Sequence, residues 1–273
     1  MDKESFVISQ LKNKFIGDDG AVVGKWVYSK DVFAEDTHFK KEWLTLSQIA
    51  KKAILVNISD AIAMNAKPKY ALLGVVIPKN FSFEQIEELT HGFLKTTKQH
   101  DIKIIGGDTV SGDKLIICVT IVSSKRKYTL GRKGLEEGDL LAYTGELGGS
   151  LEDLNRLFRG EKISEKSRFI EPVLRKEFIK RATKYLKCGL DISDSLSKDL
   201  SRICALSNLS VEFLKDFTKE ELCSGEEYEM LVAFEPKYKN KILQIAQKTN
   251  TPISIFAKAK NGLYESECKE HHF

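Results

Sequence analysis

The chain has 273 residues, of which 42% are hydrophobic and 30% charged, with 18 Gly and 5 Pro. This composition excludes collagen-like, proline-rich and intrinsically disordered proteins, and at roughly 150 residues per domain the length predicts about two domains. The 43 Lys and Arg against 39 Asp and Glu leave a formal charge of only +4. So small and dispersed an excess does not indicate a nucleic-acid-binding surface.

The cysteines and the N-terminal sequence predict a cytoplasmic protein. The five cysteines are an odd number without CxxC spacing, which argues against a disulfide framework and against a zinc knuckle. The first residues lack the basic and apolar regions of a signal peptide, and no apolar run approaches about 18 residues. We therefore expect neither export nor membrane insertion.

Apolar periodicity predicts helices and strands in alternation along the first half. Val7, Leu11 and Phe15 have helical spacing that ends at the segment 17–20, Gly-Asp-Asp-Gly, so the acidic pair lies in a loop. In chain order we expect a helix over 4–15, a strand over 21–29, a helix over 45–64, a strand over 70–77, a helix over 82–100, and strands over 102–105 and 115–122.

The polar segment 125–138, with three glycines, is the best candidate for a domain boundary. It predicts an N-terminal domain over 1–125 and a C-terminal α/β domain over 126–273. In the second half we expect strands over 140–144, 189–192, 211–214, 228–234 and 253–256, and helices over 150–158, over 173–186, from 196 onward and over 238–248. The pattern as a whole predicts an α/β (α+β) fold.

Acidic residues gather at the ends of apolar stretches, beside Gly or Ser. Such turns let a backbone approach a ligand closely, although any one of them is more simply interpreted as a turn or helix cap. The five segments are Gly17-Asp18-Asp19-Gly20, Asp31, Asn57-Ile58-Ser59-Asp60, Gly106-Gly107-Asp108-Thr109 and Asp191-Ile192-Ser193-Asp194. Taken together, the five segments indicate a ligand-binding site.

If these carboxylates converge, they form a ring of hard oxygen ligands without His or Cys neighbours, which suits Mg²⁺. Because Mg²⁺ is usually shared with substrate phosphates, a nucleotide is the expected ligand. The segment 20–25 is too short for a P-loop, and Trp26 stands where that motif needs Ser or Thr. The sequence therefore predicts that metal and backbone bind the phosphates.

An ordered series of motifs resembles the thiamine-monophosphate kinase family of the aminoimidazole ribonucleotide synthetase superfamily. The resemblance runs from about residue 15 to His272-Phe273 and covers nearly the whole chain. Besides the acidic segments it includes Ser29-Lys30-Asp31 with His38-Phe39, Ala63-Met64-Asn65-Ala66-Lys67-Pro68, and Ser224-Gly225-Glu226-Glu227-Tyr228-Glu229.

The resemblance implies ATP-dependent phosphorylation of thiamine monophosphate to thiamine diphosphate, with ATP as co-substrate and several Mg²⁺ ions per site. It also implies a homodimer whose N-terminal halves build a shared barrel flanked by two α/β halves. The acceptor is a phosphate monoester, largely ionised near neutral pH, so the reaction needs no general base to form the nucleophile.

The family's functional positions transfer onto matching residues of this chain. The resemblance implies catalytic roles for Asp60, Asp108 and Asp194, nucleotide contacts from Gly107, Arg132 and Ser193, substrate contacts from His38 and Glu226, and metal positions at Asp19, Ser29, Lys30, Asp31, Asp60, Asp108, Asp191 and Asp194.

The chain departs from the family's pattern at several positions. Lys30 replaces a usual Thr, and it either contacts phosphate, replaces a metal or is an exposed strand lysine. Glu171 stands where the family has Arg, and the aromatic residue usually found just before the terminal His-Phe is missing. Phe273 or Tyr264 is then the candidate to contact the thiamine ring. Another enzyme of the superfamily, or a nucleotide-binding module without turnover, is the alternative.

Overall fold

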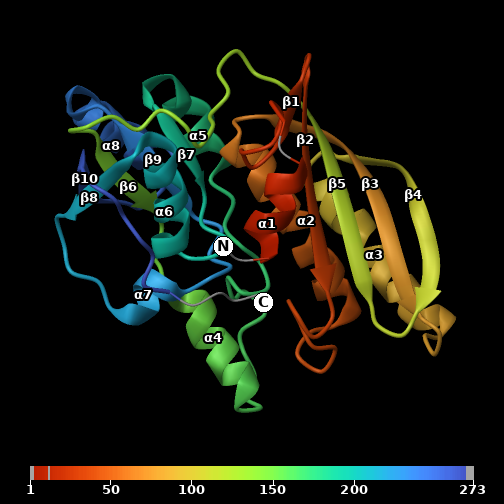
Figure 1. Ribbon diagram of the computed structural model, residues 1–273. Helices are drawn as coiled ribbons and strands as arrows, with labels where there is room; N and C mark the ends of the chain where they lie inside the picture. The colour runs from red at the N-terminus through yellow and green to blue at the C-terminus, as the bar shows by residue number, and fades with distance from the viewer. Residues whose placement is uncertain (1–2, 12, 269–273) are drawn as a thin grey trace.

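The computed structural model describes residues 3–11 and 13–268, and it contains two five-stranded sheets side by side (Figure 1). The first sheet has the order β1-β2-β5-β3-β4. Its strands are β1 (Ala21–Val23), β2 (Trp26–Ala34), β3 (Lys67–Pro78), β4 (Lys103–Gly112) and β5 (Ile116–Ser124). Only β3 and β4 pair in parallel in this sheet, and the strand β4 forms one edge.

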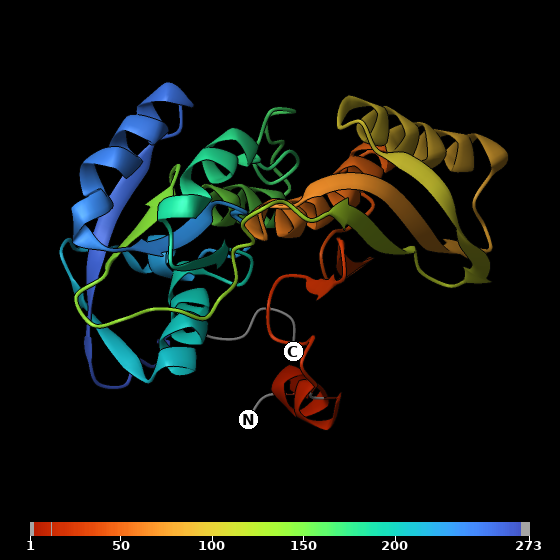
Figure 2. The same ribbon diagram turned by 90° about the horizontal axis from the view of Figure 1, so that it is seen from above.

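Two helices cover one face of the first sheet, as Figure 2 shows: α2 (Leu46–Ala63) and α3 (Phe83–Gln99). Each begins with a capping box, formed by Thr45 with Gln48 and by Ser82 with Gln85, which satisfies backbone N–H groups that the helix leaves unpaired. The helix α2 is buried on nearly every side, whereas α3 is amphipathic. The sheet and α2 therefore form the core of the first half.

The segment 125–139 leads to the second sheet, which has the order β7-β9-β6-β10-β8 with antiparallel pairs. Its strands are β6 (Leu140–Thr144), β7 (Cys188–Asp191), β8 (Leu209–Phe213), β9 (Met230–Phe234) and β10 (Ile253–Asn261). Around it lie α4 (Gly149–Phe158), α5 (Lys176–Ala182), α6 (Leu196–Ser207), α7 (Lys219–Cys223) and α8 (Lys239–Lys248), with 3₁₀ turns at Thr183–Tyr185 and Pro236–Tyr238. The first helix, α1 (Lys3–Leu11), stands off the body in front of the junction (Figure 2).

One hydrophobic core continues from the first half into the second. Ile54 and Ile58 of α2 belong to the same buried cluster as Phe169, Phe178 and Met230. Because buried apolar side chains cross the junction, the two halves are held together by packing and not by a linker alone. This packing fixes the relative position of the loops that meet there.

The structure confirms the mixed α/β class and corrects several element boundaries. The expected strand over 21–29 is a hairpin, because Gly24 at φ +60° turns the chain between β1 and β2. The expected helix over 173–186 is shorter, since α5 covers Lys176–Ala182 and a 3₁₀ turn follows it. The strand expected to end at 105 continues to Gly112, so the Gly-Gly-Asp-Thr segment lies within a strand and not in a turn.

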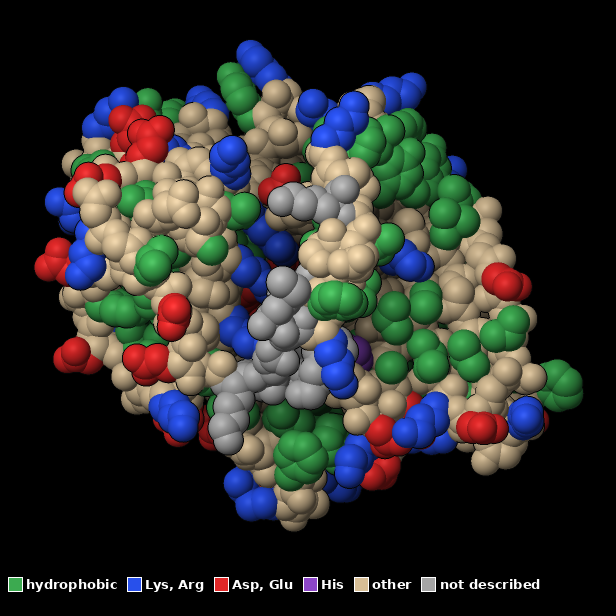
Figure 3. Space-filling view, in the orientation of Figure 1, with side chains coloured by type: hydrophobic (Ala, Val, Ile, Leu, Met, Phe, Trp, Pro, Cys, Tyr) green, Lys and Arg blue, Asp and Glu red, His purple; other side chains and the backbone are tan. Residues whose placement is uncertain are grey.

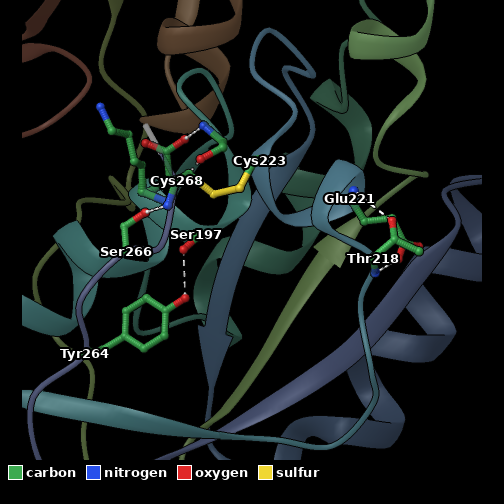
Figure 4. The surroundings of a disulfide bond; sticks show 10 residues. Ser197, Thr218, Glu221, Cys223, Tyr264, Ser266 and Cys268 are labelled. Atoms are coloured by element: carbon green, nitrogen blue, oxygen red, sulfur yellow. Dashed lines mark hydrogen bonds between the residues drawn. A yellow bond between two sulfur atoms is a disulfide. The ribbon is translucent and has the colours of Figure 1, made fainter. Parts of the chain in front are cut away.

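The expectation of no disulfide is wrong. Cys223, at the end of α7, is bonded to Cys268, with the two Cα atoms 5.4 Å apart (Figure 4). The spacing of 45 residues gives no sequence signal, because the two cysteines are brought together by the fold of the second half. Across residues 3–11 and 13–268, no helix is long and apolar enough to cross a membrane.

Candidate functional site

A cavity of about 430 Å³ lies where the two halves meet. Its walls come from β2, α2, the segment 125–139 and the turn between β7 and α6. Of the residues predicted for the site, Asp19, Lys30, Asp31, His38, Asp60, Arg132, Asp191, Ser193 and Asp194 line it. The structure thus brings together residues that are up to 175 positions apart in the sequence, from Asp19 to Asp194.

Hydroxyl groups connect the elements that carry the carboxylates. Ser29 of β2 donates to the carbonyl of Asn57 in α2 over 3.1 Å, which ties the strand to the helix. Ser59 of α2 donates to Asp191 Oδ2 at the end of β7, and so joins the two halves. Ser29 is therefore a buried support beneath the cavity and does not line it.

The carboxylates in this cavity repel one another. Burial, together with the charges of Asp31 and Asp191, raises the pKa of Asp60 well above its usual range. Burial raises the pKa of Asp31 to about 6, and the charge of Asp19 adds to the shift. Burial and the charge of Asp19 also raise the pKa of Asp191. Negative charges gathered in a low-dielectric space stabilise a bound cation.

Arg132 supplies a positive charge in direct contact with this cluster. Its guanidinium donates twice to Asp19 Oδ1, over 2.9 Å from Nε and 2.5 Å from Nη2, and its backbone N–H donates to Asp18 Oδ1 over 2.7 Å. The preceding residue, Gly131, lies close to the same carboxylate, because a Cβ there would be 2.9 Å from Asp18 Oδ1 and the Asp18 side chain would have to shift. The acidic loop at Asp18 and Asp19 is therefore held against the segment 125–139 by these hydrogen bonds.

The turn between β7 and α6 is held by Asp199, whose Oδ2 accepts from the backbone N–H groups of Ser193, Asp194 and Ser195. Arg202 donates to Asp199 Oδ1 over 2.6 Å and also to Asp194. The sequence interpretation missed Arg202. The sequence did carry a signal for it. Arg202 follows Asp199 by three residues and Asp194 by eight, so a helix that begins after the acidic turn brings its side chain back toward these carboxylates.

The residues fit a hard cation, although among the described residues no three His, Cys, Asp or Glu side chains form a ready-made metal site. Asp19 Oδ2 is buried and has no hydrogen-bond partner among those residues, and the surrounding donors are carboxylate oxygens. Mg²⁺ typically uses one or two carboxylates and completes its shell with water and substrate phosphates. This donor set therefore suits Mg²⁺ that arrives with a nucleotide.

Glu226 lies beside the cavity and not in its wall. Its Oε2 accepts from the ammonium of Lys52 over 3.0 Å, and Lys52 is completely buried in α2, with Nζ 3.6 Å from the centre of the Phe169 ring. Sequence reasoning missed Lys52, because the neighbouring Lys51 is charged as well and nothing local shows which lysine turns inward.

Two predicted residues, Gly107 and Asp108, are not brought to the cavity within one chain. Asp108 is exposed on the edge strand β4, and its Oδ1 accepts from the N–H of Thr109 over 2.9 Å. The strands β5 and β3 lie between β4 and β2, so roughly 14 Å separates Asp108 from the Asp31 position. Gly107 has a structural role of its own, since a Cβ there would lie 1.8 Å from the carbonyl oxygen of Leu73.

Comparison with known proteins places this arrangement in a family. The family described as "AIR synthase related protein, N-terminal domain" matches residues 17–124. The thiamine-monophosphate kinase of Aquifex aeolicus is 29% identical over 76% of this chain and 70% of its own length. That of Pyrococcus abyssi is 29% identical over 96% of this chain and 90% of its own length. The chain belongs to the thiamine-monophosphate kinase family.

Solved structures support the same fold. The structure described as AaThiL complexed with AMPPCP and TMP has a TM-score of 0.84 at 24% identity, covering 96% of this chain and 90% of that one. The Escherichia coli hydrogenase maturation protein HypE has a TM-score of 0.72 at 17% identity, over 95% of this chain and 91% of that one. The fold is thus shared beyond the family, and activity must be argued from the site.

Proposed function

We propose that the chain transfers the terminal phosphoryl group of ATP to thiamine monophosphate, which yields thiamine diphosphate and ADP. The observation that carries this proposal is the buried aspartate cluster at the junction of the halves, faced by Arg132. Kinship with thiamine-monophosphate kinases supports the choice of acceptor. A site rich in carboxylates suits a reaction between two phosphate groups, because each of them is bound through cations.

The chain's own residues bind and orient the two anions. Arg132 is placed to exchange part of its contact with Asp19 for a nucleotide phosphate, since a guanidinium binds carboxylate and phosphate in the same way. Ser193 lies in the turn whose backbone N–H groups Asp199 accepts, and it lines the cavity. His38 faces the acceptor side, where its Nδ1 accepts from the N–H of Ala34 over 3.1 Å, so in the neutral ring the proton is on Nε2.

Mg²⁺ belongs to this proposal, with Asp19, Asp31, Asp60, Asp191 and Asp194 as the residues that would hold it. Bound there, it would neutralise phosphate charge and favour in-line transfer. The acceptor phosphate is already ionised near neutral pH, so the chain has no proton to remove. Lys30, exposed on β2 and lining the cavity, adds a positive charge next to Asp31.

We also propose that the chain works as a homodimer, with Asp108 completing the site of a second copy. The sheet face that α2 and α3 leave open carries exposed apolar side chains, among them Val32, Leu72, Ile105 and Val110, and hydrophobic groups gather over it in Figure 3. Such a face is unusual for a monomer. A second copy on this face would cover it and would give the edge strand β4 a partner.

Acceptor selectivity tests the proposed function. ADP release and product formation are measured with ATP and either thiamine monophosphate or thiamine. We expect turnover with the monophosphate alone, because no residue is placed to remove the hydroxyl proton of thiamine. ADP release that is independent of both acceptors, or equal turnover on thiamine, would overturn the proposal. The variant His38→Gln is expected to raise KM for thiamine monophosphate and to leave kcat near its original value.

A further inference from the structure

A second arginine, Arg202 of α6, lines the aspartate cavity as Arg132 does, and the proposed function leaves it without a role. Its side chain is 29% exposed, so a ligand in the cavity can reach it. Burial raises the pKa of Asp19, and the charges of Arg132 and Arg202 oppose that shift. Both guanidinium groups therefore act on the same buried carboxylate.

Arg202 donates to two carboxylates whose surroundings differ. Its Nη1 donates to Asp199 Oδ1 over 2.6 Å. Asp199 is completely buried, its other oxygen accepts from three backbone N–H groups, and it is not part of the cavity wall. The Nη2 group of Arg202 donates to Asp194 Oδ2, and Asp194 does line the cavity. The contact with Asp199 is thus an anchor, whereas the contact with Asp194 faces the ligand space.

The helix that carries Arg202 is also held near its first turn. The hydroxyl groups of Ser197 and Tyr264 are hydrogen-bonded over 2.9 Å (Figure 4). Tyr264, which the sequence offered as a contact for the thiamine ring, therefore supports α6 and is not part of the cavity wall. The other candidate for that contact, Phe273, lies outside the described residues. With α6 fixed in this way, Arg202 changes partners by moving its side chain alone.

A cation held by Asp194 competes with Arg202 for the same carboxylate. The metal ion and the guanidinium are both positive, so a metal ion on Asp194 takes away the partner of Nη2. A guanidinium carries five N–H donors and binds phosphate and carboxylate in the same fork geometry. A phosphate that enters with the metal ion can therefore replace Asp194 on Nη2, while Nη1 stays on Asp199. This exchange avoids the cost of leaving a partly buried charge unpaired.

We propose that Arg202 is a second phosphate-binding residue, which exchanges Asp194 for a phosphate of ATP when the metal-bound nucleotide enters the cavity. The inference rests on the proposed function, since it takes the donor to be ATP bound through Mg²⁺. It gives one side chain two opposite effects. Arg202 competes with a metal ion that comes alone, and it assists the binding of a metal ion that comes with a nucleotide. An arginine that only supports the turn before α6 would not do both.

Calorimetry of the Arg202→Gln protein tests the two effects without turnover. Glutamine removes the charge and keeps an amide that can donate to Asp199 on the same face of the helix. We expect an unhydrolysable ATP analogue with Mg²⁺ to bind about tenfold more weakly, because a charge-assisted contact with phosphate is lost. We expect Mg²⁺ alone to bind about fivefold more tightly, the effect of removing a positive charge roughly 4 Å away in water-like surroundings.

Two further variants complete the test. Arg168→Gln is the matched control, because Arg168 is 26% exposed and pairs with the buried Glu229 over 3.1 Å, yet it is not part of the cavity wall. We expect it to bind Mg²⁺ and the analogue as the original protein does. Arg202→Lys keeps the charge and loses the fork, so it should hold the affinity for Mg²⁺ alone near its original value and weaken that for the analogue.

The outcomes separate this inference from the proposed function. If the original protein phosphorylates thiamine monophosphate, yet Arg202→Gln and Arg202→Lys bind the analogue as tightly as it does, Arg202 does not contact the phosphate and the activity stands. A parallel loss of affinity for Mg²⁺ alone and for the analogue would show that Arg202 only supports the turn, and would also overturn the inference. If the original protein neither binds the analogue nor transfers phosphate, both are overturned.

Discussion

At the scale of single residues, Asp60 gives the site a negative charge that lowers the stability of the fold. It lies near the end of α2, where burial and the charges of Asp31 and Asp191 raise its pKa. The variant Asp60→Asn keeps the shape and removes the charge. We expect it to unfold at a higher temperature than the original protein when metal is absent, because one source of repulsion is gone.

The same variant should lose activity, by about 100-fold or more in kcat, since charge stabilisation at the reacting phosphates depends on this cluster. Thermal unfolding with and without Mg²⁺, and turnover measured on the same preparations, check both statements. A variant that gains no thermal stability and keeps its kcat would show that Asp60 is remote from the chemistry.

Lys52 and Lys51 form a matched pair of adjacent lysines. Lys52 is completely buried and paired with Glu226, whereas Lys51 is partly exposed and paired with Glu171. Lys52→Met leaves the Glu226 carboxylate without its partner, so we expect a loss of about 3 kcal/mol in the free energy of unfolding and a higher KM for thiamine monophosphate. Lys51→Met should change stability by less than about 1 kcal/mol. Equal effects in urea unfolding would refute the difference.

At the scale of elements, the sequence predicted the helices and strands whose limits depend on neighbouring residues alone. The helices expected over 45–64 and 82–100 match α2 and α3 closely, because the capping boxes that begin them at Thr45 and Ser82 use partners only three residues away. The continuation of β4 through Gly106 and Gly107 was not, because it depends on pairing with β3, in which the register shifts between Ala71 and Leu72. Such a shift in register is set by the pairing of the two strands, and local composition does not show it.

The disulfide also belongs to the element scale, since it joins the end of α7 to Cys268. The three other cysteines are free, with Cys188 and Cys204 buried and Cys118 partly accessible. We expect the unreduced native protein to be alkylated at Cys118 alone, and reduction to expose Cys223 and Cys268. Mass spectrometry of the alkylated chain checks this.

Reduction should lower the free energy of unfolding by about 2–4 kcal/mol, because the cross-link restricts the unfolded chain. The variant Cys268→Ser should show the same loss, with no further effect of reductant. Labelling of Cys223 and Cys268 without reductant would show that the bond does not form in solution.

At the scale of the whole molecule, the ordered motifs predicted the family and most of the residues that line the cavity. They could do so because motifs in the same order fold in the same way and so meet at the same site. They could not show that Asp108 and Asp31 lie on different strands separated by two others. Nor could they reveal Lys52 or Arg202, since these lie outside the motifs. The boundary at residue 125 and the cytoplasmic location stay predictions.

Mixing two inactive variants tests whether Asp108 acts in a second copy. In a mixed dimer of Asp60→Ala and Asp108→Ala, one site combines both defects and the other combines an intact Asp60 with an intact Asp108. We expect activity to return to about one quarter of the original after random exchange in equal amounts. Sedimentation shows whether dimers form. No recovery in a proven mixed dimer would mean that Asp108 does not complete the partner's site.

The most direct measurement of the central claim is ³¹P NMR of the protein with ATP, Mg²⁺ and thiamine monophosphate. Direct transfer predicts that the monoester signal of thiamine monophosphate falls while the two coupled signals of thiamine diphosphate and those of ADP rise together, without inorganic phosphate. The Asp60→Asn protein should leave the spectrum unchanged. Growth of inorganic phosphate with ADP, and an unchanged thiamine monophosphate signal, would contradict the account.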